Sequence, residues 1–246
     1  MKNKTILITG GSSGIGLATA KKYAEQQANI IIIVGKTEDR LIDAAKEIGK
    51  NVTYYIADIS KTASLHDLYK KLKAKSIEID VLIASAGLGK FVSVEEVSEE
   101  VYDLVMDTNT KGTFFTVSTL KPILKKGGHI VLISSFLAHK SLPLTSVLSA
   151  SKVAVETFTK IFAREFSDDQ IKVNAISPGS IKSNFMKVAG ISEEQQKNLS
   201  LNMPKIPLGK RGDAAQIADV ILFLTSPGAS YINGTVLSVD GGISIA

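Results

Sequence analysis

The chain alternates short apolar runs with longer segments of helical periodicity from one end to the other. Most of the short runs are apolar throughout, without alternation, which is typical of strands buried on both faces of a parallel sheet. These runs predict seven strands, at Thr5–Thr9, Asn29–Val34, Val52–Ala57, Val81–Ala84, Gly128–Ser134, Lys172–Ser177 and Thr235–Val239. Helical periodicity predicts six helices between them, at Ile15–Gln27, Asp39–Ile48, Thr62–Lys75, Glu99–Leu124, Ser146–Phe166 and Ala214–Leu224.

This order of elements predicts an α/β fold of the Rossmann-like, doubly wound type, with a mainly parallel sheet flanked by helices on both faces. No repeat or low-complexity linker divides the 246 residues, so we expect one domain spanning 1–246. A ligand should lie beyond the carboxyl ends of the strands. We expect the less regular stretch at about 181–210 to be a substrate lid, the alternative being an extra pair of surface helices. Its apolar residues are Phe185, Met186, Leu199 and Met203.

Composition narrows the function classes. There is no cysteine, and His66, His129 and His139 are scattered, so we predict no disulfide and no metal site. The net charge of +5 comes from lysines spread along the helices rather than gathered with aromatic residues, which argues against a nucleic-acid partner. No apolar run approaches the ~20 residues of a membrane span, and no cleavage site follows the first apolar run. We therefore expect a cytoplasmic protein with no membrane partner.

A glycine-rich turn follows the first predicted strand and opens the first predicted helix. It reads Gly10-Gly11-Ser12-Ser13-Gly14-Ile15-Gly16. Glycines at such a turn let the backbone approach a pyrophosphate, and the helix N-terminus offers N–H groups to the anion. The spacing of Gly10, Gly14 and Gly16 resembles that of the short-chain dehydrogenase/reductase family.

The resemblance recurs through nearly the whole chain, at 57–59, 85–87, Asn109, 176–179 and 234–242. It implies that the chain is a dinucleotide-binding and catalytic domain whose cofactor site draws on several strand ends. The implied residues are Gly10, Ser12, Ser13, Gly14, Ile15 and Gly16 at the pyrophosphate, Asp58 and Ile59 at the adenine, Ser85, Ala86 and Gly87 along the cofactor, Lys152 at the ribose, and Pro178, Gly179, Ile181 and Ser183 beside the nicotinamide. The alternative is that such small residues merely make turns.

The end of the second predicted strand bears on the choice of cofactor. An acidic residue there would hold the ribose 2′-hydroxyl of NAD, whereas a basic residue would accommodate the 2′-phosphate of NADP. The strand ends in Gly35, where NAD-preferring relatives carry aspartate, and Lys36 follows. Lys36 and the absence of the aspartate predict NADP. NAD stays the less favoured alternative, because Ser13 stands where many NADP-preferring relatives have a second base and because exposed lysines are usually only solvated.

The family's catalytic pattern is Y-x-x-x-K, and the matching segment here is Leu148-Ser149-Ala150-Ser151-Lys152. Leucine thus takes the place of the tyrosine. The resemblance implies Ser135 as the catalytic serine, Lys152 as the catalytic lysine, and Asn109 as the residue that supports the lysine through a water. His139 lies in the loop toward the site and could donate a proton, although a lone loop histidine is more often incidental.

Three functions remain open. The first is an NADP-dependent oxidoreductase that moves hydride to or from a small, partly apolar carbonyl or alcohol, with proton transfer by Ser135, by a water on Lys152 or by the substrate itself. The second is a non-redox dehydratase or isomerase. The third is a catalytically silent NADP(H)-binding sensor or partner subunit. The resemblance also implies a homo-oligomer, a tetramer or dimer, paired through the long helices at 99–124 and 146–166.

Overall fold

The computed structural model describes residues 3–182, 185 and 204–246. Seven parallel strands form one sheet in the order β3-β2-β1-β4-β5-β6-β9. The strands are β1 (Thr5–Thr9), β2 (Ile30–Gly35), β3 (Val52–Ile56), β4 (Ile79–Ala84), β5 (Leu124–Ile133), β6 (Lys172–Pro178) and β9 (Val236–Val239). Because the strand order reverses between β1 and β4, a crevice opens at their carboxyl ends. The predicted fold class is confirmed.

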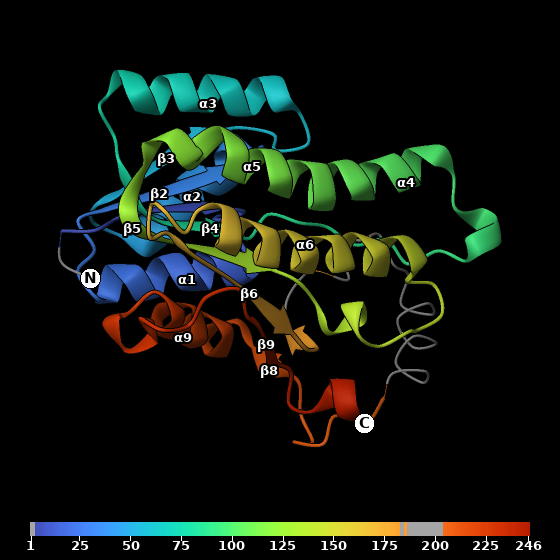
Figure 1. The fold of residues 1–246 in the computed structure, drawn as a ribbon. Helices are drawn as coiled ribbons and strands as arrows, with labels where there is room; N and C mark the ends of the chain where they lie inside the picture. Colours follow the sequence, from blue (N-terminus) through green and yellow to red (C-terminus); the bar gives the residue numbers. More distant parts are fainter. Residues whose placement is uncertain (1–2, 183–184, 186–203) are drawn as a thin grey trace.

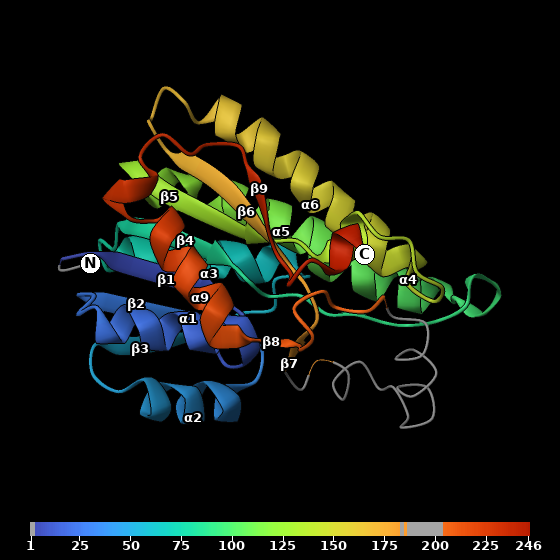
Figure 2. The ribbon, with the colours of Figure 1, turned by 90° about the horizontal axis from the view of Figure 1, so that it is seen from below.

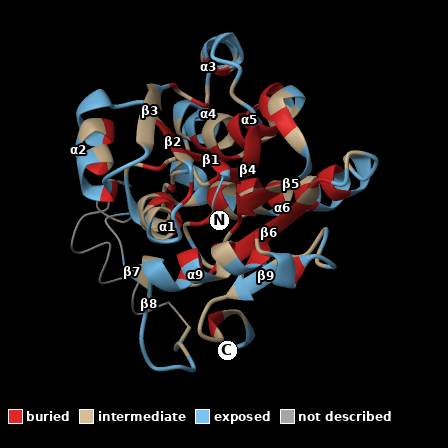
Figure 3. Ribbon diagram, turned by 90° about the vertical axis from the view of Figure 1, so that its left-hand side faces the viewer, coloured by how far each residue is buried: buried red, intermediate tan, exposed pale blue. Residues whose placement is uncertain are grey.

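Helices cover both faces of the sheet (Figure 1 and Figure 2). One face carries α3 (Thr62–Ala74), α4 (Glu99–Met106), α5 (Gly112–Leu120) and α6 (Ser146–Glu165), and the other carries α1 (Gly14–Glu25), α2 (Glu38–Ile48) and α9 (Ala214–Leu224). Each face has its own apolar core: Leu68, Val117 and Phe162 belong to the first, and Tyr23 and Ile221 to the second. The central strands are therefore buried from both sides (Figure 3), which explains why they lack apolar–polar alternation.

The prediction of one continuous helix over 99–124 is wrong, because the structure divides this range into several elements. Between α4 and α5 the backbone widens into a π-helical stretch at Asp107–Lys111, which turns Asn109 into the interior. A 3-10 turn at Lys121–Ile123 contains Pro122, which cannot continue the helix, and β5 begins at Leu124. That strand starts before the predicted Gly128 because Leu124 already pairs with Ile79 across a bulge.

The stretch beyond β6 contains an element that the sequence did not predict. Ile181–Lys182 (β7) pairs with Gly212–Asp213 (β8) in a separate two-stranded parallel sheet. Two-residue strands are too short to give a periodic signal. Most of the predicted lid, including Met186, Leu199 and Met203, lies outside the described residues, so the lid stays a prediction. Among the helices that the structure does describe, none has the length and apolar character needed to cross a membrane.

Candidate functional site

Two glycines of the turn after β1, Gly10 and Gly16, have no room for a side chain. A Cβ built on Gly16 would lie 2.3 Å from the carbonyl oxygen of Gly10, and one on Gly10 would lie 2.8 Å from Cα of Ala86. Gly10 also has a positive φ of 69°. The turn therefore lies directly against the backbone that follows β4, at the sequence-predicted residues Ser85 and Ala86.

The start of α1 leaves room for an anion. Ser13 precedes the helix in an extended conformation and makes no side-chain capping bond, so the first N–H groups of α1 are left without that partner. A Cβ on Gly14 would meet nothing within 4 Å. Open backbone N–H groups at a helix N-terminus suit a phosphate. The turn thus fits the pyrophosphate of a dinucleotide.

The end of β2 presents basic side chains to solvent. Gly35 lies beside the turn, since a Cβ built on it would be 3.6 Å from Oγ of Ser12. Lys36 is exposed directly after it, and Arg40 is exposed in the first turn of α2. Arg40 was not among the residues that the sequence predicted for this site.

The predicted adenine residues have structural contacts of their own. Asp58 Oδ1 accepts hydrogen bonds from the backbone N–H of Ser60, at 3.0 Å, and from its hydroxyl, at 2.7 Å. Ile59 is buried, and its carbonyl oxygen would lie 2.9 Å from a Cβ on Gly112. Both residues therefore shape the turn at the end of β3, which does not conflict with a ligand contact there.

Asn109 joins the loop after β4 to α6. Its Oδ1 accepts from the N–H of Leu88 at 2.9 Å, and its Nδ2 donates to the carbonyl oxygen of Leu88 at 2.8 Å and to Oγ of Ser151 at 3.0 Å. A Cβ built on Gly87 would lie 3.1 Å from Asn109 Oδ1 and 3.4 Å from Lys152 Nζ. The structure thus brings Asn109 and Lys152 to the same glycine, Gly87.

Lys152 is not a solvated helix lysine. Its Nζ donates to the carbonyl oxygen of Ile133, at the end of β5, over 2.8 Å. Burial lowers the pKa of this amine from 10.5 to about 8. The group can therefore gain and lose a proton near neutral pH.

Ser135 follows the same strand end. It is extended, and its Oγ accepts from the N–H of Leu137 at 3.2 Å, which caps the short 3-10 helix η4 (Phe136–Ala138). Ser135 and the carbonyl that holds Lys152 are thus two residues apart. The structure places both predicted residues at one strand end.

Leu148, one helical turn before Lys152, is only 2% exposed. It packs in an apolar cluster with Phe136, Leu137 and Ile243, and partly buried Phe91 also contacts this cluster. A Cβ built on Gly89 would come within 3.1 Å of Leu148 Cδ2. The position at which the resemblance implies a phenol is therefore dry and apolar.

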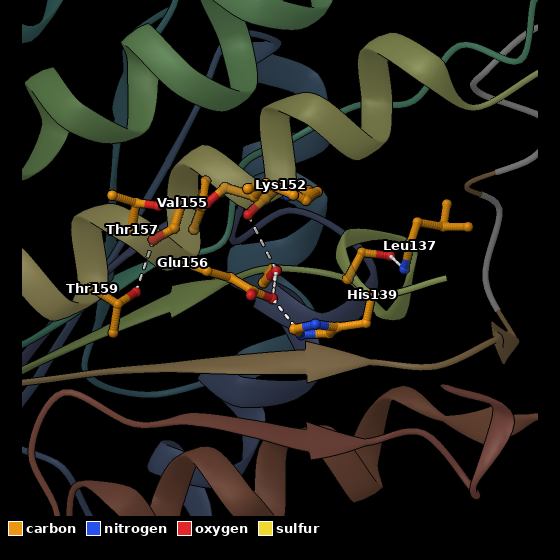
Figure 4. Close-up of polar contacts among 10 residues, drawn as sticks. Leu137, His139, Lys152, Val155, Glu156, Thr157 and Thr159 are labelled. Carbon is orange, nitrogen blue, oxygen red and sulfur yellow. Dashed lines mark hydrogen bonds and ion pairs between the residues drawn. The ribbon is translucent and has the colours of Figure 1, made fainter. Parts of the chain in front are cut away.

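Sequence reasoning missed one polar cluster at the end of β5 (Figure 4). Glu156, one turn after Lys152 on α6, accepts at Oε1 from Ser134 Oγ at 2.7 Å, and His139 Nε2 lies 3.0 Å from the same oxygen. His139 is therefore not an isolated loop residue. The signal available was the spacing of Glu156 from Lys152, but nothing local pairs it with His139.

The end of β6 closes the site. A Cβ built on Gly179 would lie 2.6 Å from Cα of Asp240, so only glycine fits against the segment after β9. Pro178 pairs with Val239, and Ile181 lies in β7. Ser183 is outside the described residues.

Comparison with known proteins decides the family. Residues 10–244 match the family profile described as enoyl-(acyl carrier protein) reductase. An oxidoreductase of Sarocladium schorii is 32% identical over 99% of this chain and 97% of its own length. The 3-oxoacyl-(acyl-carrier-protein) reductase FabG of Thermotoga maritima is 32% identical over 100% of this chain and 99% of its own. The chain belongs to the short-chain dehydrogenase/reductase family.

Solved structures agree with this assignment. A protein described as a short chain dehydrogenase/reductase family protein superposes with a TM-score of 0.86 at 32% identity, covering 100% of this chain and 99% of that one. The fold of the family accounts for the strand order and for the crevice at the carboxyl ends of the strands. In this chain Asn109 and Lys152 both approach Gly87, and the apolar Leu148 lies one helical turn before Lys152.

Proposed function

We propose that this short-chain dehydrogenase/reductase binds NADP(H) and transfers hydride to or from a partly apolar carbonyl or alcohol, with the proton supplied through Lys152. The observation that carries the proposal is the buried Lys152 amine, whose pKa is lowered to about 8 beside Asn109 and Gly87. A general acid or base works best when its pKa lies near the working pH.

The cofactor assignment rests on three features of the crevice. The glycine turn and the uncapped start of α1 suit the pyrophosphate, and Lys36 and Arg40 give the end of β2 the positive charge that a 2′-phosphate requires. Glu38 and Asp39 also lie in the first turn of α2, and they limit that charge. A bound reduced nicotinamide would supply the hydride.

The proposed proton route combines two side chains of this protein, Lys152 and Ser135, with one water. In its ammonium form Lys152 donates one hydrogen bond to the Ile133 carbonyl, and it would offer its remaining protons to a water. Such a water would carry the proton to the substrate oxygen. The Ser135 hydroxyl, at the same strand end, would donate a hydrogen bond to that oxygen.

A partly apolar substrate is supported by two aromatic side chains near Leu148. Phe185 is 39% exposed and approaches Gly89, and the partly buried Phe91 packs against the cluster that contains Leu148. A 3-oxoacyl thioester, the substrate class in the name of the Thermotoga maritima relative, is therefore the first probe, beside simple ketones and enones.

A titration with NADPH and NADH, followed by cofactor fluorescence, tests the cofactor assignment. We expect tighter binding of NADPH, and Lys36→Ala should weaken NADPH binding by roughly 1 kcal/mol or more, as befits a charge-assisted contact, while leaving NADH almost unchanged. Lys46→Ala, on the distal turn of α2, is the matched control. Equal effects of Lys36→Ala on both cofactors would refute the assignment.

The pH profile of carbonyl reduction tests the proton route. Because the ammonium form is the donor, the rate of reduction should be highest below the pKa of about 8 and should fall above it. Lys152→Arg keeps the charge but cannot release a proton in this range, so the rate and its pH dependence should both be lost.

The competing candidate is a silent NADP(H)-binding protein, and the dry surroundings of Leu148 favour it. Tight NADPH binding without turnover of any carbonyl, enone or hydroxyacyl substrate would establish that reading. Conversion of a hydroxyacyl thioester without any change in cofactor absorbance would instead establish a dehydratase.

A further inference from the structure

Glu156, Ser134 and His139 form a polar cluster between α6, which carries Lys152, and the segment after β5, which carries Ser135. Glu156 lies four residues after Lys152, on the same face of the helix. Its side chain is 10% exposed, so its carboxylate needs hydrogen-bond donors. Ser134 and His139 both reach Oε1, at 2.7 Å and 3.0 Å.

Ser134 also contacts the backbone that carries Lys152. Its hydroxyl lies 3.4 Å from the Lys152 carbonyl oxygen while it donates to Glu156 (Figure 4). Successive residues of an extended chain point to opposite sides. Holding Ser134 against α6 therefore fixes the direction in which Ser135 points.

His139 holds the other end of the same segment. The 3-10 helix η4 is capped at its start by Ser135 Oγ, and His139 is the residue directly after its end. The contact of His139 with Glu156 thus ties the end of η4 to α6. Phe136 and Leu137, which η4 carries, pack against Leu148.

We infer that Glu156, tied to Ser134 and His139, is a positioning residue that sets Lys152 and Ser135 relative to each other; the role in turnover rests on the proposed function. Glu156 acts through these contacts and not as a counter-ion, because burial is the cause of the lowered pKa of Lys152. Glutamine at position 156 should therefore preserve the positioning role, whereas alanine at that position should not.

Three variants distinguish the hydrogen-bonding role of Glu156 from an effect of its negative charge. Glu156→Gln keeps an acceptor oxygen for Ser134 and His139, whereas Glu156→Ala removes it. Glu165→Gln, an exposed acid on the last turn of the same helix, is the matched control. Thermal unfolding of each variant shows which ones are folded.

The first readout needs no turnover. Lysine labelled with carbon-13 at Cε gives an NMR titration of the full chain, and the Lys152 signal is assigned by its loss in Lys152→Arg. We expect a midpoint at about 8 in the parent, Glu156→Gln and Glu165→Gln. In Glu156→Ala it should move toward the ordinary lysine value of about 10.4, because a loosened α6 admits water.

The second readout is the kinetics of the carbonyl that the parent reduces. We expect Glu156→Ala to lower kcat by about 10- to 100-fold, the effect of misplaced reacting groups, with little change in the KM for NADPH. Glu156→Gln should restore most of this loss, and His139→Ala should show a smaller loss than Glu156→Ala.

The inference would be overturned if a folded Glu156→Ala protein had the same Lys152 titration midpoint and the same kcat as the parent. It would also be overturned if Glu156→Gln lost as much kcat as Glu156→Ala. If Glu156→Ala does not fold, Ser134→Ala and His139→Ala, which each remove one donor, are judged by the same criteria. A parent that reduces nothing defeats the proposed function, while the titration still decides the role of Glu156.

Discussion

Lys152 and Leu148 lie one helical turn apart on α6, and burial affects them in opposite ways. For Lys152 it lowers the pKa from 10.5 to about 8, so between these pH values the unfolded chain holds a proton that the folded chain has released. Stability contributed by this group is therefore lowest below pH 8 and recovers as the pH rises toward 10.5. For Leu148 burial is favourable, since the side chain packs with Phe136, Leu137 and Ile243.

Leu148→Tyr tests how closely this cluster is packed. The added ring volume and hydroxyl should lower the free energy of unfolding by about 1–3 kcal/mol, because an already buried position must accept a larger, polar side chain. Urea unfolding of the variant beside Leu148→Met, a swap of similar volume expected to cost less than about 1.5 kcal/mol, gives the comparison. A tyrosine variant as stable as the parent would show that the pocket has space for a phenol beside Lys152.

At the level of elements, the sequence predicted what local patterns determine. The strands, most helices and the glycine turn follow from periodicity and from glycine geometry within short stretches. The π-helical stretch around Asn109 and the pairing of β7 with β8 depend on contacts between distant segments. The same holds for Glu156 and His139, which come together only when α6 packs over the end of β5. The sequence showed both residues but not their proximity.

Two glycines in the first turn of α1, Gly14 and Gly16, should respond differently to substitution by alanine. Gly16→Ala would place a Cβ 2.3 Å from the Gly10 carbonyl oxygen, so the turn must open, and we expect a loss of stability of more than about 2 kcal/mol together with loss of NADPH binding. Gly14→Ala meets no atom within 4 Å and carries only the strain of a positive φ, about 1–2 kcal/mol.

Melting temperatures and NADPH titrations of both proteins check this order. Gly49→Ala, which also has a positive φ and open space but lies after α2, controls for backbone strain away from the crevice. Equal losses for Gly14 and Gly16 would contradict the close approach seen in the structure.

At the scale of the whole molecule, the outer face of α4 and α6 carries apolar side chains that are exposed to solvent in the single chain. Tyr102 is 48% exposed, and Val153 and Ile161 are each 47% exposed, the latter two being two helical turns apart on one face of α6. Neighbouring Val155 and Phe162 are buried, so the apolar character of α6 serves the core as well as this surface. Exposed apolar groups that recur on one helix face favour an interface.

We therefore predict that the protein forms a homo-oligomer, a tetramer or a dimer, through the paired faces of α4 and α6. Light scattering at micromolar concentration should give a mass of two or four times the 26.3 kDa of one chain. A double variant, Val153→Lys with Ile161→Lys, should lower that mass, because each lysine would place an unpaired charge in the interface. Val94→Lys, at an exposed apolar residue of a 3-10 turn outside these helices, should leave the mass unchanged. A monomer mass for the parent would refute the prediction. If the double variant kept the parent mass while remaining folded, the interface would have to lie elsewhere, and α4 and α6 would be exposed for another reason.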